Sequence, residues 1–330
     1  MPMQVNIFNY DASSFKSYLS SEPEKAFILD LSEATVLEII NEYTNIRVKL
    51  SPRFKKSYSC LVHNLQLLQA EFGCILRPIQ ITDVFWYNFA AFLVNKGLAV
   101  SSIQTLCSQL LSAIQWGAKH KAPIAQSLDL FIMPSFKRQQ LALSQDDISR
   151  IYHFDLRTTG KRSQYIRNMT TIKDMFVLSC NLGQRHSDMV RIEKSHFNRN
   201  IFTIVQQKTG NTARVDIDKF ALDAKTTYAI LEKYNYEAPY KGDISSYNKY
   251  LKQLMLYVGF NEVVKREERI AGQIKSESCE KYKLISSHTA RRTFATVNVL
   301  RGHKYTEIRR ATGHKSESGF EKYICYGIDY

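Results

Sequence analysis

Apolar residues recur at helical spacing through the first half of the chain. Between residues 51 and 133 these stripes predict three helices, because one face of an α-helix returns every three to four residues. The stripes consist of Leu61, Leu65, Leu68 and Phe72, then Val84, Phe85, Phe89, Phe92 and Leu93, then Ile103, Leu106, Leu110, Leu111 and Ile114. We interpret these side chains as the core of a small helical domain.

Polar residues mark the ends of the predicted helices. Thr82 and Gly97 bound the second helix, and Ser101 or Ser102 is expected to cap the third. One more helix is expected from Ser32 to about Tyr43. It falls in an N-terminal extension, residues 1–50, to which the pattern assigns no role.

Residues 134–144 have little apolar periodicity and contain Pro134, which predicts a linker. Ser144 follows as a helix cap, with two aspartates in the first turn. We therefore expect a second domain over residues 145–330. A chain of 330 residues is long enough for two cores.

The second domain is expected to be helical with one β interruption. Ile201 to Val205 is β-branched and aromatic, Lys208 to Asn211 is typical of a turn, and Ala213 to Ile217 alternates again. Lys208 would lie at the tip of this hairpin. Helices are expected from there to the C-terminus, which gives a mainly α fold with a small β-hairpin.

The last helices are delimited by residues that favour helix ends. His288 and Arg291 are three residues apart on one predicted helix, so both side chains share a face. The expected end signals in this region are Ser286 or Ser287, Gly302, Thr306, Gly313 and Ser316.

The charge balance indicates a polyanionic partner. The chain has 45 Lys and Arg against 31 Asp and Glu, a net charge of +14. Residues 281–330 alone hold ten basic against four acidic residues, a net of +6. A solvated basic face is the ordinary explanation of such a run. Its coincidence with reactive side chains favours a surface that binds phosphate, in nucleic acid rather than in a membrane.

Cysteine spacing and hydropathy limit the remaining classes. The six cysteines are far apart and form no C-x-x-C pair, which argues against a zinc site and a disulfide scaffold. The N-terminus lacks the features of a signal peptide, and the run Phe89 to Val94 is too short to span a bilayer. We expect a cytoplasmic protein, associated with the nucleoid when bound to DNA.

One set of polar residues suggests chemistry on a phosphodiester without metal. It consists of Arg185, Lys208, His288, Arg291, His314 and Tyr323. Such a reaction needs cations that stabilise the transition state and a proton for the departing oxygen. No Asp/Glu cluster of the kind that a metal-dependent nuclease needs accompanies the histidines.

Each residue of the set can be given a role. Arg185 and Arg291 would bracket the non-bridging oxygens, because a guanidinium binds two phosphate oxygens and stays charged. Tyr323 would be the nucleophile, with Tyr326 and Tyr330 as nearby rivals. His288 would accept the phenol proton and His314 would donate to the phosphate. Lys208 would protonate the leaving 5′ oxygen. Each residue alone is more often structural; their joint order and spacing carry the hypothesis.

In this order and spacing the chain resembles the tyrosine recombinase (phage integrase) family. The blocks Ser287 to Thr296 and Thr312 to Glu317 are similar to integrases of conjugative and mobilisable elements. The resemblance implies a core DNA-binding domain at residues 51–133 and a catalytic domain at 145–330. It also implies that Asp188 supports the site from behind the catalytic groups.

The resemblance further implies an activity and partners. A 3′-phosphotyrosine intermediate would form with no cofactor, metal or ATP. A homotetramer would hold two sites on double-stranded DNA and exchange strands through a Holliday junction, with accessory DNA-bending proteins as further candidate partners. Asn181 and Gln184 depart from the small or apolar residues usual around the first arginine. Residues 1–50 do not show a strand-rich arm-binding module, and only seven residues follow Tyr323.

Two other functions fit parts of this pattern. A nicking and resealing enzyme like a type IB topoisomerase would use the same chemistry as a monomer with little site preference. A DNA-binding regulator would keep the fold without catalysis, but it would not need Tyr323 or Lys208.

Overall fold

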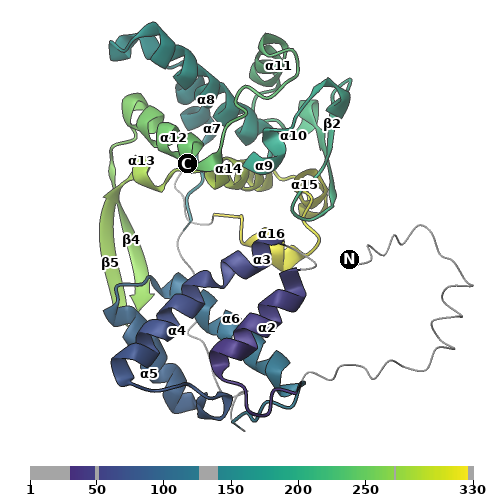
Figure 1. Cartoon of the computed structure of the whole chain (residues 1–330). Coiled ribbons are helices and arrows are strands. Elements are labelled where there is room, and N and C mark those ends of the chain that lie inside the picture. The colour runs from purple at the N-terminus through teal and green to yellow at the C-terminus, as the bar shows by residue number, and fades with distance from the viewer. Residues whose placement is uncertain (1–29, 49–51, 126–139, 271–272, 326–330) are drawn as a thin grey trace, which may run out of the picture. The chain divides into compact units, whose positions relative to one another are not determined.

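The computed structural model describes residues 30–48, 52–125, 140–270 and 273–325, and the chain forms two compact units, Met1–Phe136 and Lys137–Tyr330 (Figure 1). Most of the expected linker, residues 134–139, lies outside the described residues. The expected division into an extension, a core DNA-binding domain, a linker and a catalytic domain stays a prediction.

The first unit is helical over its described residues. Its elements are α2 (Val36–Val48), α3 (Pro52–Ser57), α4 (Ser59–Phe72), η1 (Pro78–Gln80), α5 (Asp83–Asn95) and α6 (Val100–Ala118). The predicted apolar stripes supply most of its core, around the fully buried Trp86, Phe89 and Leu110. Phe72 and Val84 are exceptions, because 67% and 64% of their surfaces are exposed.

Helix ends in the first unit differ in part from the sequence prediction. Thr82 caps α5 as expected, with its hydroxyl accepting from Phe85 N. The cap of α6 is Ala99, so the prediction of Ser101 or Ser102 was wrong by about two residues. The N-terminal helix begins at Val36 rather than Ser32, and α2 packs in the same core as α4 and α6. Residues 36–48 are thus an integral part of the helical unit.

The second unit is built around α8 (Ser163–Leu182), whose C-terminal half is buried without interruption from Asp174 to Leu182. Helices pack around it on several sides (Figure 1). They are α7 (Gln145–His153), α10 (Ile217–Phe220), α11 (Ala224–Lys233), α12 (Ile244–Val258) and α14 (Ser287–Leu300). Short elements η3 (Leu156–Thr159), α9 (His186–Met189) and η4 (Lys194–His196) link them. Burial of α8 explains why its sequence lacks a simple one-faced stripe.

A small antiparallel sheet follows α9. Its strands are β1 (Phe197–Asn198), β2 (Ile201–Val205) and β3 (Thr212–Asp216), in that order. Phe202 pairs with Val215 and Ile204 with Ala213, so the buried positions alternate along both strands. The predicted hairpin is therefore present, and Lys208 lies in its turn.

A second hairpin contradicts the expectation that only helices follow residue 217. Strands β4 (Val263–Ile270) and β5 (Gln273–Glu280) pair with each other between α12 and α13 (Lys281–Leu284). The segment is rich in Lys, Arg and Glu, residues with low strand preference, so its composition gave no strand signal.

The C-terminal helices carry the remaining polar residues. Ser286 precedes α14 as predicted, and its backbone N donates to Thr289 Oγ1. Thr306 does not cap the next helix, because α15 (Tyr305–Thr312) starts after Lys304. Gly313 ends α15 in the left-handed region, and Ser316 caps α16 (Glu317–Glu321) through Gly319 N, both as predicted. The fold class, mainly α with a small β-sheet, is confirmed.

Gly183, which ends α8, offers a test of close packing. Its φ is +65°, and an added Cβ would lie 2.4 Å from the Phe294 ring. Gly183→Ala should therefore lower the free energy of unfolding by about 2–5 kcal/mol, from a left-handed alanine and an overpacked core. Gly160 is the matched control, since it has the same φ of +65° and nothing within 4 Å of an added Cβ.

Gly160→Ala should lower the free energy of unfolding by only about 1–2 kcal/mol, the contribution of the left-handed backbone alone. Urea unfolding of the full-length chain followed by circular dichroism measures both variants. Equal losses in the two variants would contradict the close approach of Phe294 to the end of α8.

Candidate functional site

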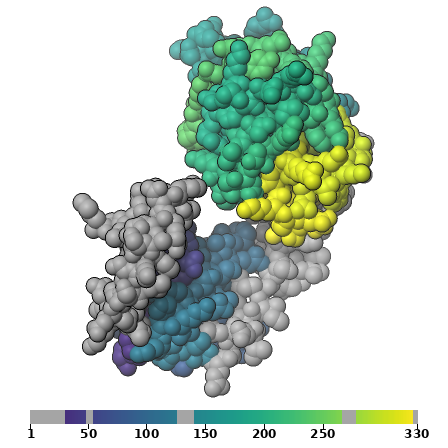
Figure 2. All heavy atoms as spheres, turned by 90° about the vertical axis from the view of Figure 1, so that its right-hand side faces the viewer, coloured from purple at the N-terminus to yellow at the C-terminus, as the bar shows by residue number. Residues whose placement is uncertain are grey.

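All the candidate residues belong to the second unit, on five separate stretches of chain. Arg185 and Asp188 lie at α9, Lys208 in the β2–β3 turn, and His288 and Arg291 on α14. His314 follows α15, and Tyr323 follows α16. In Figure 2 the C-terminal segment, in yellow, lies on the surface of this unit next to the part in green.

Arg291 is the most buried of the candidates, with none of its surface exposed. Its Nη1 donates to Gly183 O at 3.0 Å, and its Nη2 donates to Thr312 O at 2.6 Å. These carbonyls close α8 and α15, where the helix dipole favours a cation. Burial and then the charge of Arg185 lower the Arg291 pKa, but a guanidinium keeps its charge at neutral pH.

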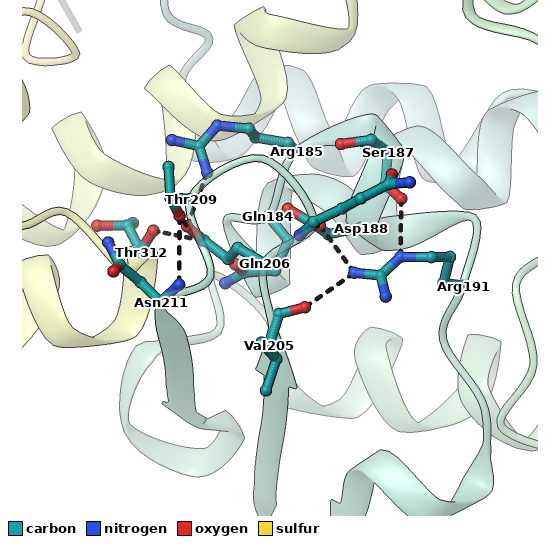
Figure 3. Close-up of polar contacts among 11 residues, drawn as sticks. Gln184, Arg185, Ser187, Asp188, Arg191, Val205, Gln206, Thr209, Asn211 and Thr312 are labelled. Carbon is teal, nitrogen blue, oxygen red and sulfur yellow. Dashed lines mark hydrogen bonds and ion pairs between the residues drawn. The ribbon is translucent and has the colours of Figure 1, made fainter. Parts of the chain in front are cut away.

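Arg185 stands at the N-terminal end of α9 and is half-buried. Its Nη1 donates to Oε1 of Gln206 at 2.7 Å (Figure 3). Among the described residues this is the one hydrogen bond given to its guanidinium, so its other N–H groups can bind a ligand oxygen. Its charge acts on Arg291, which means that two cations face one region of the site.

Asp188 lies behind these groups and is fully buried. Its Oδ1 accepts from Arg191 Nη2 at 2.9 Å and from Gln207 N at 2.8 Å. Its charge also raises the Arg291 pKa, which opposes the effect of burial. Asp188 thus joins α9 to the residue before Lys208, and it balances part of the positive charge.

Lys208 is exposed in the turn between β2 and β3. The base of the turn is fixed by two backbone bonds of 2.9 Å, from Gln206 N to Asn211 O and from Gly210 N to Gln206 O. Gly210 has a φ of +65°, which favours glycine at this position. The lysine side chain can therefore move while its backbone is held.

His288 lies on the same face of α14 as Arg291 and remains exposed. Its pKa is lowered, first by the atoms packed around the imidazole and then by the charges of Arg292, Arg291, Arg185 and Lys208. These interactions bring Lys208 and both arginines of the predicted set into its surroundings. At neutral pH the imidazole is uncharged and can accept a proton.

His314 is wedged between Arg291 and Tyr323. Its Nε2 lies 3.1 Å from Arg291 Nη2, and its Nδ1 lies 2.8 Å from Thr312 Oγ1. Because arginine only donates and the Thr312 hydroxyl already donates to Ile308 O, the network assigns the proton to Nδ1. Burial and the charges of Arg291, Arg185 and Arg309 lower the His314 pKa to about 3.

The Tyr323 ring contacts both Arg291 and His314. Its ring centroid is 5.3 Å from the Arg291 guanidinium carbon and 4.7 Å from the His314 ring centroid. Its backbone carbonyl accepts from Thr296 Oγ1 at 3.4 Å, which ties the segment after α16 to α14. The rivals Tyr326 and Tyr330 lie outside the described residues.

The structure thus brings the predicted residues into one neighbourhood, and it adds residues that the sequence did not single out. Gln206, Thr312 and Gly183 supply the acceptors that orient the arginines. Gln206 is two residues from Lys208, but a glutamine beside a turn has no distinguishing pattern. The backbone carbonyls have no sequence signal at all.

The described residues contain neither a cluster of metal ligands nor a membrane-spanning helix. No group of three His, Cys, Asp or Glu side chains lies close enough together there to hold a metal ion. None of the helices in that part of the chain has both the length and the apolar character needed to cross a bilayer.

Comparisons by sequence give no match, either to a family model or to a curated protein. Comparison of structures gives several matches. The chain is similar to lambda integrase(75–356), solved as a dimer bound to a COC′ core site, with a TM-score of 0.65 and 15% identity over 90% of this chain and 98% of that one. Lambda integrase as a tetramer bound to a Holliday junction gives 0.63 and 14%, over 96% and 86%.

A third similar structure is the Tn1549 transposon integrase in complex with circular intermediate DNA. Its TM-score is 0.60 at 13% identity, over 89% of this chain and 96% of that one. At such low identity the likeness establishes the fold and not the activity. The chain therefore has the fold of these integrases.

Proposed function

We propose that this chain is a site-specific DNA recombinase or integrase. It would cut and rejoin duplex DNA through a 3′-phosphotyrosine intermediate, without metal or ATP. The observation that carries the proposal is the contact of Tyr323 with the buried Arg291 and with His314. A tyrosine held against a buried cation is suited to attack an anion that the same cation binds.

The two arginines would bind the scissile phosphate. Arg291 is held rigidly by two carbonyls, and Arg185 keeps N–H groups available for phosphate oxygens. Each guanidinium would stabilise the extra negative charge of the transition state. The net charge of +14 favours the approach of DNA.

Bond making and breaking would proceed in line. The Tyr323 oxygen forms a bond to phosphorus as the bond from phosphorus to the 5′ oxygen breaks. Neutral His288 takes the phenol proton, and Lys208 protonates the departing 5′ oxygen. Attack by a 5′ hydroxyl of another strand reverses these steps and rejoins the DNA, because the phosphotyrosine bond conserves the energy.

His314 would donate to the phosphate, but its present contacts do not yet allow this. Its Nε2 accepts from Arg291 and its Nδ1 faces Thr312. A bound phosphate would draw the Arg291 N–H away and oppose the charges that lower the His314 pKa. We therefore propose that His314 takes up its role only with DNA in place.

The proposed partners follow the same reasoning. The substrate would be double-stranded DNA, with a homotetramer on two sites and accessory DNA-bending proteins. Resemblance to integrases of conjugative elements suggests a mobile element as the setting, in the cytoplasm at the nucleoid. A monomer that only nicks and reseals, or a regulator without catalysis, would share the fold. The first would not assemble a tetramer on two sites, and the second would form no protein–DNA adduct.

The nucleophile can be trapped. Mixed with nicked duplexes carrying the ends of its element, the chain should form a protein–DNA adduct that survives denaturant. Tyr323→Phe should abolish the adduct, while Tyr326→Phe and Tyr330→Phe should keep it, as resolved by denaturing gel electrophoresis. An adduct that persists in Tyr323→Phe would refute this assignment, and tight DNA binding without any adduct would favour a regulator.

The pH dependence of cleavage tests His288. Because its pKa in the folded chain is lowered below 6.5, the base stays neutral at pH 7 and gains its proton only under more acidic conditions. Single-turnover cleavage should be constant from about pH 8 to 6.5 and fall below that range. His288→Gln should cut roughly 100–10,000-fold more slowly and lose this acid limb. A rate that instead falls as the pH rises through 6.5 would contradict a neutral base.

Binding of the DNA backbone should depend on salt. If the excess Lys and Arg side chains neutralise many phosphates, the affinity for DNA should fall roughly 1,000-fold or more between about 50 and 200 mM salt. The reason is that binding releases the counterions condensed on the DNA. Fluorescence anisotropy with a labelled duplex measures this slope. A nearly flat response would contradict binding through the phosphate backbone, whatever the outcome of the cleavage assays.

A further inference from the structure

We propose that Gln206 is the positioning residue of this site. Through one buried amide it would set the direction of Arg185, the place of Arg291 and the base of the Lys208 turn. The inference rests on the proposed function, since it concerns how these groups are arranged for cleavage. It assigns a task to a residue that lies outside the predicted set.

The first contact is to Arg185. Gln206 has 1% of its surface exposed, and its Oε1 accepts from Arg185 Nη1 at 2.7 Å (Figure 3). A long arginine side chain loses much of its rotational freedom only when something fixes it. A single short bond to a buried, immobile acceptor directs the rest of the fork toward the site.

The second contact is shared with Arg291. Gln206 Nε2 donates to Thr312 O at 2.8 Å, and Arg291 Nη2 donates to the same oxygen at 2.6 Å. The two arginines are thus connected through one amide and one carbonyl. Their separation is fixed by these bonds, which matters because both must meet the oxygens of a single phosphate.

The third contact is to the Lys208 turn. Thr209 Oγ1 donates to Gln206 Oε1 at 3.0 Å, and Gly210 N donates to the Gln206 carbonyl at 2.9 Å. The packing is close on the other side as well, because a Cβ added to Gly313 would lie 2.7 Å from the Gln206 amide. The turn is therefore anchored to the end of α15.

Gln184 completes the arrangement. Its Oε1 accepts from Gln206 Nε2 at 3.1 Å, and its Nε2 donates to Leu182 O and Ala311 O at 2.7 and 2.8 Å. A buried amide is stable only when its donors and acceptors are satisfied, and the bond between the two amides satisfies the Gln184 oxygen and one N–H of Gln206. Gln184, which replaces the small or apolar residue usual near the first arginine, thus has a physical role. A carboxylate at position 206 would instead neutralise Arg185.

The test is single-turnover cleavage of a nicked duplex by the full chain. Gln206→Met keeps the size of the side chain but removes its hydrogen bonds. It should slow cleavage on the order of 10–100-fold, the range for groups that orient a catalytic side chain. DNA affinity should change less than about 3-fold, because the charges of both arginines remain. Gln206→Asn, whose amide is one methylene short, should show the same split if Gln206→Met does not fold.

Two further variants distinguish a positioning role of Gln206 from a merely structural one. Asn211→Ala removes a bond from Asn211 Nδ2 to Gly313 O at 3.0 Å, which anchors the same turn without touching an arginine. It should cleave near the wild-type rate. Arg185→Ala should cleave about 100–1,000-fold more slowly, and Gln206→Met should slow this variant less than it slows the wild type, because the part of its effect that acts through Arg185 is already lost.

The outcomes separate the two proposals. If the wild-type chain forms the adduct, three results would each overturn the role of Gln206. They are unchanged cleavage by Gln206→Met, an equal loss of rate in Asn211→Ala, and losses of rate that multiply in the double variant. Those results would leave the recombinase proposal intact. Absence of a wild-type adduct on its own DNA ends would count against the proposed function itself, and the positioning role would fall with it.

Discussion

The burial of the Arg291 guanidinium is the constraint on which the site depends. A cation with no exposed surface is stable only if hydrogen bonds replace water, and here the carbonyls of Gly183 and Thr312 do so. Both carbonyls lie where a helix ends. The ends of α8 and α15 must therefore meet beside α14, and much of the packing around α8 brings them together.

Glycine at these helix ends makes this meeting possible. Gly183 lets α8 stop in the left-handed region while the Phe294 ring passes close to it. Gly313 does the same for α15 while leaving room for the Gln206 amide. The two arginines are thus oriented by backbone and amide groups that carry no net charge, so their positive charge stays available to a bound phosphate.

The order of polar residues in the sequence predicted several elements of the second unit correctly. It gave the hairpin around Lys208, the helix with His288 and Arg291 on one face, and the caps at Ser144 and Ser316. It missed the β4–β5 hairpin, because charged residues in a paired ribbon give no strand signal. It also displaced the starts of α6 and α15, since Ser and Thr near a helix start compete for the cap.

The sequence by itself determined most of the elements, the β4–β5 hairpin excepted, and which side chains of the site share a face, because both follow from local periodicity and turn chemistry. Tertiary structure decided which groups hold those side chains. Three contacts join segments far apart in the chain. They are the bond of Gln206 with Arg185, the bond of Gln206 with the Thr312 carbonyl, and the contact of Arg291 with His314. Such contacts depend on how helix ends are placed in space, and no spacing along one segment encodes that.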